Sequence, residues 1–141
     1  MDKKVFLALV LVFLLSACGG PVQSTTEITV EATDFAYSPL SITVPAGQPV
    51  TLALKNAGNV EHDFVVENIK LTDVHASNSE PAEHHQMGHS PEYDLHFFAK
   101  AGETTSLQFT AMEPGTYEIF CSIEGHKEAG MIGKLIVAAQ E

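Results

Sequence analysis

The sequence predicts an all-β fold, a sandwich of two sheets, on three observations. Apolar residues alternate with polar ones along much of the chain, which is the pattern of strands with one buried face. Turn-forming residues, chiefly glycine and proline, separate the alternating segments. No segment has the spacing of an amphipathic helix. With 141 residues, the chain suits a single domain.

The alternating segments begin near Glu27, and we expect the folded domain to span residues 27–141. In each segment the apolar side chains share one face of a strand, which is expected to face the core. These sets are, in order, Ile28 and Val30; Val50, Leu52 and Leu54; Leu107, Phe109 and Ala111; Tyr117, Ile119 and Cys121; and Leu135 and Val137. The turns between them are Pro45-Ala46-Gly47, Asn56-Ala57-Gly58-Asn59, Ala101-Gly102-Glu103 and Glu113-Pro114-Gly115.

The first residues indicate export. Lys3 and Lys4 precede 11 apolar residues, too few for a membrane-spanning helix of roughly 20. The Leu-Ser-Ala-Cys that follows resembles the lipobox of bacterial lipoproteins, in which the signal is cut before an acylated cysteine. We therefore predict a signal peptide at residues 1–17 and a lipid-anchored Cys18, in the extracytoplasmic cell envelope. An ordinary secreted protein whose signal ends near a cysteine is the alternative.

Two segments fall outside the alternating pattern. Residues 18–26 are small and polar, and we interpret them as a flexible tether after the lipidated cysteine. Residues 71–93 lose the alternation and are predicted to form a long exposed insertion loop. Within it, three imidazoles and a thioether could bind a second metal ion, or could belong to a solvated polar loop. They are His84, His85, Met87 and His89, with His75 and His96 nearby in sequence.

The composition restricts the partners. The chain has 18 Asp and Glu against 7 Lys and no arginine, for a net charge of −11. This balance argues against a nucleic-acid partner and favours a basic surface on any charged partner. Of the two cysteines, Cys18 lies in the expected processing site, so we do not expect a disulfide framework. We expect a monomer.

The last part of the chain carries candidate metal donors. Cys121, His126 and Met131 follow a Cys-x4-His-x4-Met spacing between two predicted strands. A thiolate, imidazoles and a weak thioether suit copper, because soft sulfur favours Cu(I) and imidazole serves both oxidation states. His62, at the start of another predicted strand, supplies the second imidazole. The thiol of Cys121 shares a strand face with core residues and is expected to point between the sheets.

Taken together, these features resemble the cupredoxins, small type 1 blue copper proteins such as plastocyanin, azurin and rusticyanin. The resemblance implies a Greek-key β-sandwich in which His62, Cys121 and His126 hold one copper ion and Met131 is the axial ligand. The motifs that carry it are Asp34-Phe35-Ala36-Tyr37-Ser38-Pro39, Ile42-Thr43-Val44-Pro45-Ala46-Gly47, His62-Asp63-Phe64, Gly115-Thr116-Tyr117 and the segment from Cys121 to Met131.

The resemblance also assigns two supporting residues. Asp63 and Ser122 occupy the positions after the first histidine and after the cysteine, where cupredoxins brace the ligand loops by hydrogen bonds. Glu124 is a departure, because many relatives have proline before the Gly-His pair, and its charge is expected to affect the redox potential. The insertion at residues 71–93 is a second departure, absent from the smallest cupredoxins.

Three strong ligands and one weak one leave no ready position for a substrate, so we expect an electron carrier and no enzyme. Its expected partners are redox proteins such as a cytochrome c or a membrane oxidoreductase. A copper carrier that delivers or buffers copper is the alternative, and a cupredoxin fold without metal is a further one. Zinc is disfavoured by the thioether, and a binuclear copper centre is disfavoured because the loop has no second cysteine.

Overall fold

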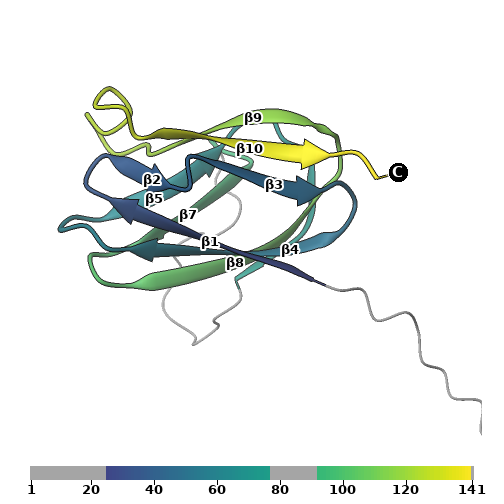
Figure 1. Cartoon of the computed structure of the whole chain (residues 1–141), viewed down its shortest axis with the longest axis horizontal. Coiled ribbons are helices and arrows are strands. Elements are labelled where there is room, and N and C mark those ends of the chain that lie inside the picture. The colour runs from purple at the N-terminus through teal and green to yellow at the C-terminus, as the bar shows by residue number, and fades with distance from the viewer. Residues whose placement is uncertain (1–24, 77–91, 141) are drawn as a thin grey trace, which may run out of the picture.

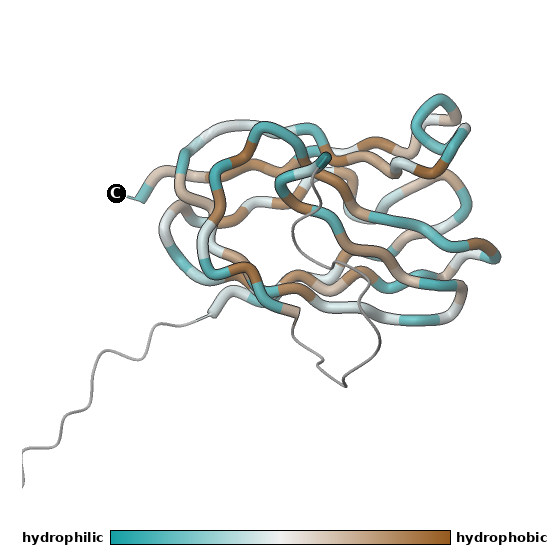
Figure 2. The backbone as a smooth tube through the Cα atoms, turned by 180° about the vertical axis from the view of Figure 1, so that it is seen from behind, coloured by the Kyte–Doolittle hydropathy of each residue, from teal (hydrophilic) through white to brown (hydrophobic). Residues whose placement is uncertain are grey.

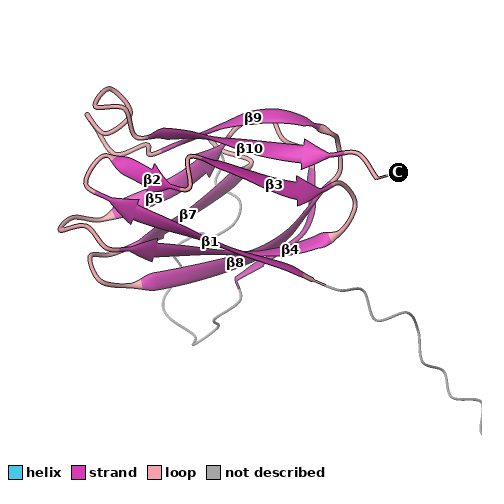
Figure 3. Ribbon diagram, in the orientation of Figure 1, coloured by secondary structure: helices cyan, strands magenta, loops and turns pink. Residues whose placement is uncertain are grey.

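The computed structural model describes residues 25–76 and 92–140, in which the chain forms ten strands and no helix (Figure 3). The predicted all-β sandwich is confirmed. The strands are β1 (Thr26–Thr33), β2 (Ala36–Ser38), β3 (Ser41–Pro45), β4 (Pro49–Asn56), β5 (His62–Val66), β6 (Leu71–Ala76), β7 (Leu95–Ala99), β8 (Thr104–Ala111), β9 (Gly115–Phe120) and β10 (Ile132–Ala138).

The strands form two five-stranded sheets that pack face to face (Figure 1). The first sheet has the order β2-β1-β4-β8-β6, and the second has the order β3-β10-β9-β5-β7. Neighbouring strands are antiparallel except for two pairs, β1 with β4 and β3 with β10. The chain passes between the sheets several times, so residues distant in sequence meet in the core.

The core lies between the two sheets and is built from the alternating residues that the sequence predicts. Along the tube in Figure 2, hydrophobic residues recur on the strands and hydrophilic ones gather at the turns. Burial of such side chains stabilises the fold by about 25 cal/mol for each Å² of apolar surface removed from water. The largest fully buried side chains include Phe64, Phe97, Phe109, Leu52, Leu54, Leu95, Leu107 and Leu135.

The structure corrects the start of the predicted insertion. Residues 71–76 are strand β6, which pairs with β8 at the edge of the first sheet. The alternation is hidden there because the register with β8 shifts within the strand and Asp73 has a positive φ of 53°. An edge strand also tolerates more polar residues. Residues 77–91 lie outside the described residues.

Three of the connecting segments lie at one end of the sandwich, and the first strand begins at the other end. The turn between β1 and β2, the turn between β4 and β5, and the loop between β9 and β10 lie together at the left end in Figure 1. Strand β1 begins at the opposite end, at Thr26, one residue before the expected domain start. In the described part of the chain, no helix is long and apolar enough to cross a bilayer.

Candidate metal centre

Three of the predicted donors come together at the end of the sandwich that carries the loops. One donor atom from each of His62, Cys121 and His126 lies within 4.8 Å of the others. His62 and Cys121 are fully buried and His126 is 8% exposed. The rings of the two histidines lie 5.0 Å apart between centroids, and Cys121 Sγ is 3.3 Å from His126 Nδ1.

His62 is the first residue of β5, and it pairs with Ala99 of β7. The loop before it is held by Asn56, a buried residue at the end of β4. The Asn56 amide donates to the carbonyl oxygens of Val60 and Ala99, at 2.7 and 2.8 Å, and accepts a hydrogen bond from the Gly58 N–H. The Asn56 side chain therefore connects the loop before His62 to β7, the strand with which His62 pairs.

The loop from Cys121 to Met131 is closed by its own backbone. Cys121 N–H donates to the Met131 carbonyl at 3.2 Å, and Met131 N–H donates to the His126 carbonyl at 3.0 Å. Gly125 and Gly130 have φ of 83° and 100°, a conformation that glycine adopts without steric cost. The turns at these glycines bring His126 back over Cys121.

The unpartnered ring nitrogens of His62 indicate that the donor group fits a metal ion. Both ring nitrogens of His62 are buried, and neither has a hydrogen-bond partner among the described residues. Leaving a polar atom buried without a partner is costly. A metal ion bound at one of these nitrogens would satisfy it, and the thiol and second imidazole beside it are donors that copper prefers.

Burial sets the protonation of these groups in the metal-free chain. It raises the pKa of the Cys121 thiol to about 12, so the sulfur holds its proton at neutral pH. Burial also lowers the pKa of His62 below 6.5, which keeps that imidazole neutral. A neutral imidazole is ready to bind a metal, whereas the thiol must first release a proton.

Asp63 and Ser122 brace the two ligand segments, as the resemblance implies. The Ser122 N–H donates to Asp63 Oδ1 at 2.7 Å, and the Ser122 hydroxyl donates to Asp63 Oδ2. Burial acts to raise the pKa of Asp63, but hydrogen bonds from His96 and Ser122 outweigh it and hold the pKa below its usual range. The brace therefore carries a negative charge next to the ligands.

Asp34 is a neighbour of the site that the sequence pattern did not predict. Its Oδ1 lies 3.6 Å from His62 Nε2, and its two carboxylate oxygens accept hydrogen bonds from the backbone and side chain of Asn59. These bonds from Asn59 hold the pKa of Asp34 below its usual value. Asp34 belongs to a motif that carried the resemblance, but only the fold brings it to His62.

Met131 and Glu124 complete the predicted loop. Met131 is fully buried in the core beside the loop, and its role as the axial ligand stays a prediction. Glu124 is exposed. The candidate second site cannot be placed, because His84, His85, Met87 and His89 lie outside the described residues; His75 and His96 lie on strands of different sheets.

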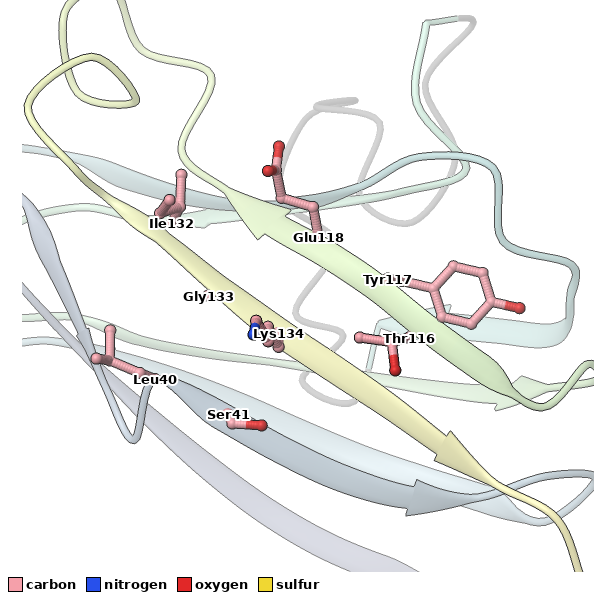
Figure 4. A pocket seen from close by; sticks show the side chains of 8 residues that line it. All are labelled: Leu40, Ser41, Thr116, Tyr117, Glu118, Ile132, Gly133 and Lys134. Carbon is pink, nitrogen blue, oxygen red and sulfur yellow. The ribbon is translucent and has the colours of Figure 1, made fainter.

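A separate hollow lies away from the donors, on the outer face of the second sheet. It has a volume of about 480 Å³ and spans β3, β10 and β9 (Figure 4). Leu40 and Ile132 supply its exposed apolar side chains. None of the three grouped donors lines it, so it is not part of the metal centre.

A two-sheet β-sandwich with a buried group of two imidazoles and one thiol at one end defines a mononuclear copper protein of the cupredoxin class. The comparison with protein families agrees, because the family described as Cupredoxin-like domain matches residues 5–137. The chain belongs to this family. The expected fold and the expected copper cofactor are both supported by this membership and by the donor group.

Two curated relatives are similar over most of this chain. The chain is 33% identical over 115 residues to the copper-resistant cuproprotein CopI of Rubrivivax gelatinosus, covering 82% of this chain and 67% of that protein. It is 33% identical over 131 residues to auracyanin-A of Chloroflexus aurantiacus, covering 84% of this chain and 75% of the relative.

The solved structures agree on the fold. A structure of auracyanin A, described as a "blue" copper protein from Chloroflexus aurantiacus, matches with a TM-score of 0.57 at 25% identity, covering 82% of this chain and all of that chain (100%). Auracyanin B matches with a TM-score of 0.60 at 23% identity, covering 84% and 92% of the two chains. A multicopper oxidase from Campylobacter jejuni shares the fold at 12% identity, with a TM-score of 0.58 over 85% of this chain and 31% of its own.

Proposed function

We propose that the protein carries single electrons by means of one copper ion and has no enzymatic activity. The observation that carries this proposal is the burial of His62, Cys121 and His126 as one donor group, each less than a tenth exposed. Such burial favours electron transfer over catalysis, because it leaves little space for a substrate beside the donors. A copper ion held by a thiolate and two imidazoles supplies a Cu(I)/Cu(II) couple.

The chain's own residues would keep the donors in place during electron transfer. The Asp63–Ser122 hydrogen bonds link the segment of His62 to that of Cys121. The bond between Met131 N–H and the His126 carbonyl closes the loop. A rigid donor set lowers the cost of changing oxidation state, because little rearrangement follows the electron. Met131 would supply a weak thioether ligand.

We also propose that residues 1–17 are a signal peptide and that lipidated Cys18 anchors the domain to an extracytoplasmic membrane surface. Strand β1 begins at the end of the sandwich opposite the donor loops (Figure 1). An anchor before β1 is therefore attached to the end of the sandwich opposite the donors, so it does not cover the donor end. Fractionation tests this: the wild type should partition with membranes and Cys18→Ala should not, and equal partition would contradict the anchor.

The partner is proposed to be a basic redox protein, such as a cytochrome c or a basic domain of a membrane oxidoreductase. Asp34, Glu61 and Glu124 are exposed near the donors. Opposite charges speed association and are screened by salt. Electron transfer to cytochrome c should therefore slow as salt increases, and a rate independent of salt would contradict this choice.

Copper handling is the second candidate function, favoured by the 33% identity to a copper-resistant cuproprotein. In this alternative the protein buffers or delivers copper, with the histidines of residues 84–89 as a second site. Copper stoichiometry and copper transfer to a chelator would be compared between the wild type and a His84→Ala/His85→Ala/His89→Ala variant. A lower stoichiometry and altered transfer in the variant favour copper handling; equal values remove the second site.

The electron-carrier proposal is tested by adding Cu(II) to the purified protein. We expect an intense blue or green charge-transfer band that disappears with ascorbate. Cys121→Ser should abolish the band because the hydroxyl cannot supply the sulfur-to-copper transition, whereas Met131→Leu should keep it and raise the potential. A colourless wild type, or an unchanged band in the Cys121 variant, would overturn the proposed site.

A further inference from the structure

The carboxylate of Asp63 connects the donor segments to a histidine outside the donor group. Asp63 follows His62 on β5 and is 4% exposed. Its carboxylate accepts two hydrogen bonds from Ser122, the residue after Cys121, and its Oδ2 lies 3.1 Å from His96 Nε2. This buried carboxylate, next to His62 in sequence, thus joins the neighbour of Cys121 to the imidazole of His96.

A buried carboxylate requires compensation, because an unpaired charge is costly to remove from water. In the part of the chain that the structure describes, His96 Nε2 lies 3.1 Å from Asp63 Oδ2, and the two groups form an ion pair when the imidazole is protonated. An amide at this position would need no counter-charge. With aspartate at this position, His96 can compensate the buried negative charge, a role that asparagine would not require.

We propose that His96 is a positioning residue that orients the Asp63 carboxylate and links electron uptake at the metal centre to proton uptake. This inference rests on the proposed electron-carrier function. His96 lies on β7, the edge strand of the second sheet, and its side chain is 23% exposed, so water reaches it.

Two titratable side chains from different segments contact His96. They are Asp63 from β5 and Tyr93 from the segment before β7, whose ring meets that of His96 edge to face at 5.5 Å between centroids. Tyr93 also contacts Phe120. Lys127 Nζ lies 3.9 Å from the centroid of the Phe120 ring. The same ammonium group forms an ion pair with Glu118 at 2.7 Å.

The direction of the coupling follows from the charges. Electron uptake removes one positive charge from the metal centre, so the centre repels a proton on His96 less, while the attraction of the negative Asp63 is unchanged. One electron comes from the redox partner and up to one proton comes from water. The proton forms an N–H bond at His96 Nδ1, because Nε2 faces Asp63. The reduced state is therefore favoured as pH falls.

The first test measures the potential of the copper-loaded protein at a series of pH values. In the wild type, the equilibrium with a one-electron titrant should shift toward the oxidised state as pH rises, by up to about tenfold per pH unit. His96→Gln keeps an amide that can donate to Asp63 but cannot take up a proton, and its profile should be flat. His75→Gln, at an exposed position on β6, is the matched control and should keep the slope. Equal slopes in the wild type and His96→Gln would overturn the coupling.

The second test uses the metal-free protein, so it does not depend on copper binding. Hydrogen exchange of the Ser122 amide reports the bond to Asp63. His96→Ala should speed this exchange several-fold, His96→Gln should restore it, and His75→Ala should leave it unchanged. Unaltered exchange in His96→Ala would overturn the positioning role. Failure of copper binding with altered exchange would instead overturn the proposed function and leave the positioning role supported.

Discussion

The rings of Phe35 and His126 meet edge to face, with centroids 5.1 Å apart. Phe35 lies in the turn between β1 and β2 with a positive φ of 67°, a conformation unusual for a bulky residue. Phe35 is 46% exposed, while His126 is 8% exposed. The phenyl ring therefore covers the imidazole at the donor end.

Removing this ring should open the metal centre to solvent. We expect Phe35→Ala to release copper to a chelator several-fold faster than the wild type, because competing ligands reach His126 more easily. Leu40→Ala is the control, since Leu40 is also exposed but lines the separate hollow on the second sheet. Equal release rates in Phe35→Ala and the wild type would show that the ring does not shield the site.

Gly58 leaves no space for a side chain beside His62. A β carbon at this position would lie 2.9 Å from His62 Nε2 and 2.5 Å from Asp34 Oδ1. Gly58→Ala should therefore displace the imidazole or the carboxylate and weaken copper binding by roughly tenfold or more, since such strain costs about 1–3 kcal/mol. Copper titration measures this, with Ala57→Ser as the neighbouring control. An unchanged affinity would mean that the loop moves away without cost.

Asn56 is expected to be important for stability as well as for the site. Asn56→Ala leaves the carbonyl groups of Val60 and Ala99 without its hydrogen bonds and should lower the free energy of unfolding by about 1–3 kcal/mol. Urea denaturation of the metal-free protein measures the loss. Thr29→Ala, at an exposed position on β1, should change stability by less than about 0.5 kcal/mol. A similar small change in Asn56→Ala would contradict the prediction.

The metal-free protein should lose stability as pH falls below about 6.5, because the pKa of His62 is lowered by burial. The unfolded chain then binds a proton at His62 that the folded chain excludes, so the contribution is present above the unfolded pKa and is lost below it. Urea denaturation at a series of pH values measures this. His62→Gln should show a smaller loss over the same range, and an equal loss would assign the effect to other groups.

The sequence by itself was sufficient for the fold class, because alternating hydrophobicity is a local property that each strand carries on its own. The buried faces of β4 and β10 follow it residue by residue. The spacing of Cys121, His126 and Met131 was equally readable, since all three lie on one loop. Strand β6 was missed, because its register shift and the positive φ of Asp73 interrupt the alternation.

Only the tertiary structure brought Asp34 to His62 and His96 to Asp63. Each contact joins residues at least 28 positions apart, on strands or turns whose neighbours are decided by the pairing of whole sheets. Sequence spacing carries no information about such contacts, because loop closure costs little more for a long connection than for a shorter one. The donor types could therefore be predicted from the chain, whereas the charges that surround the donors were decided by packing.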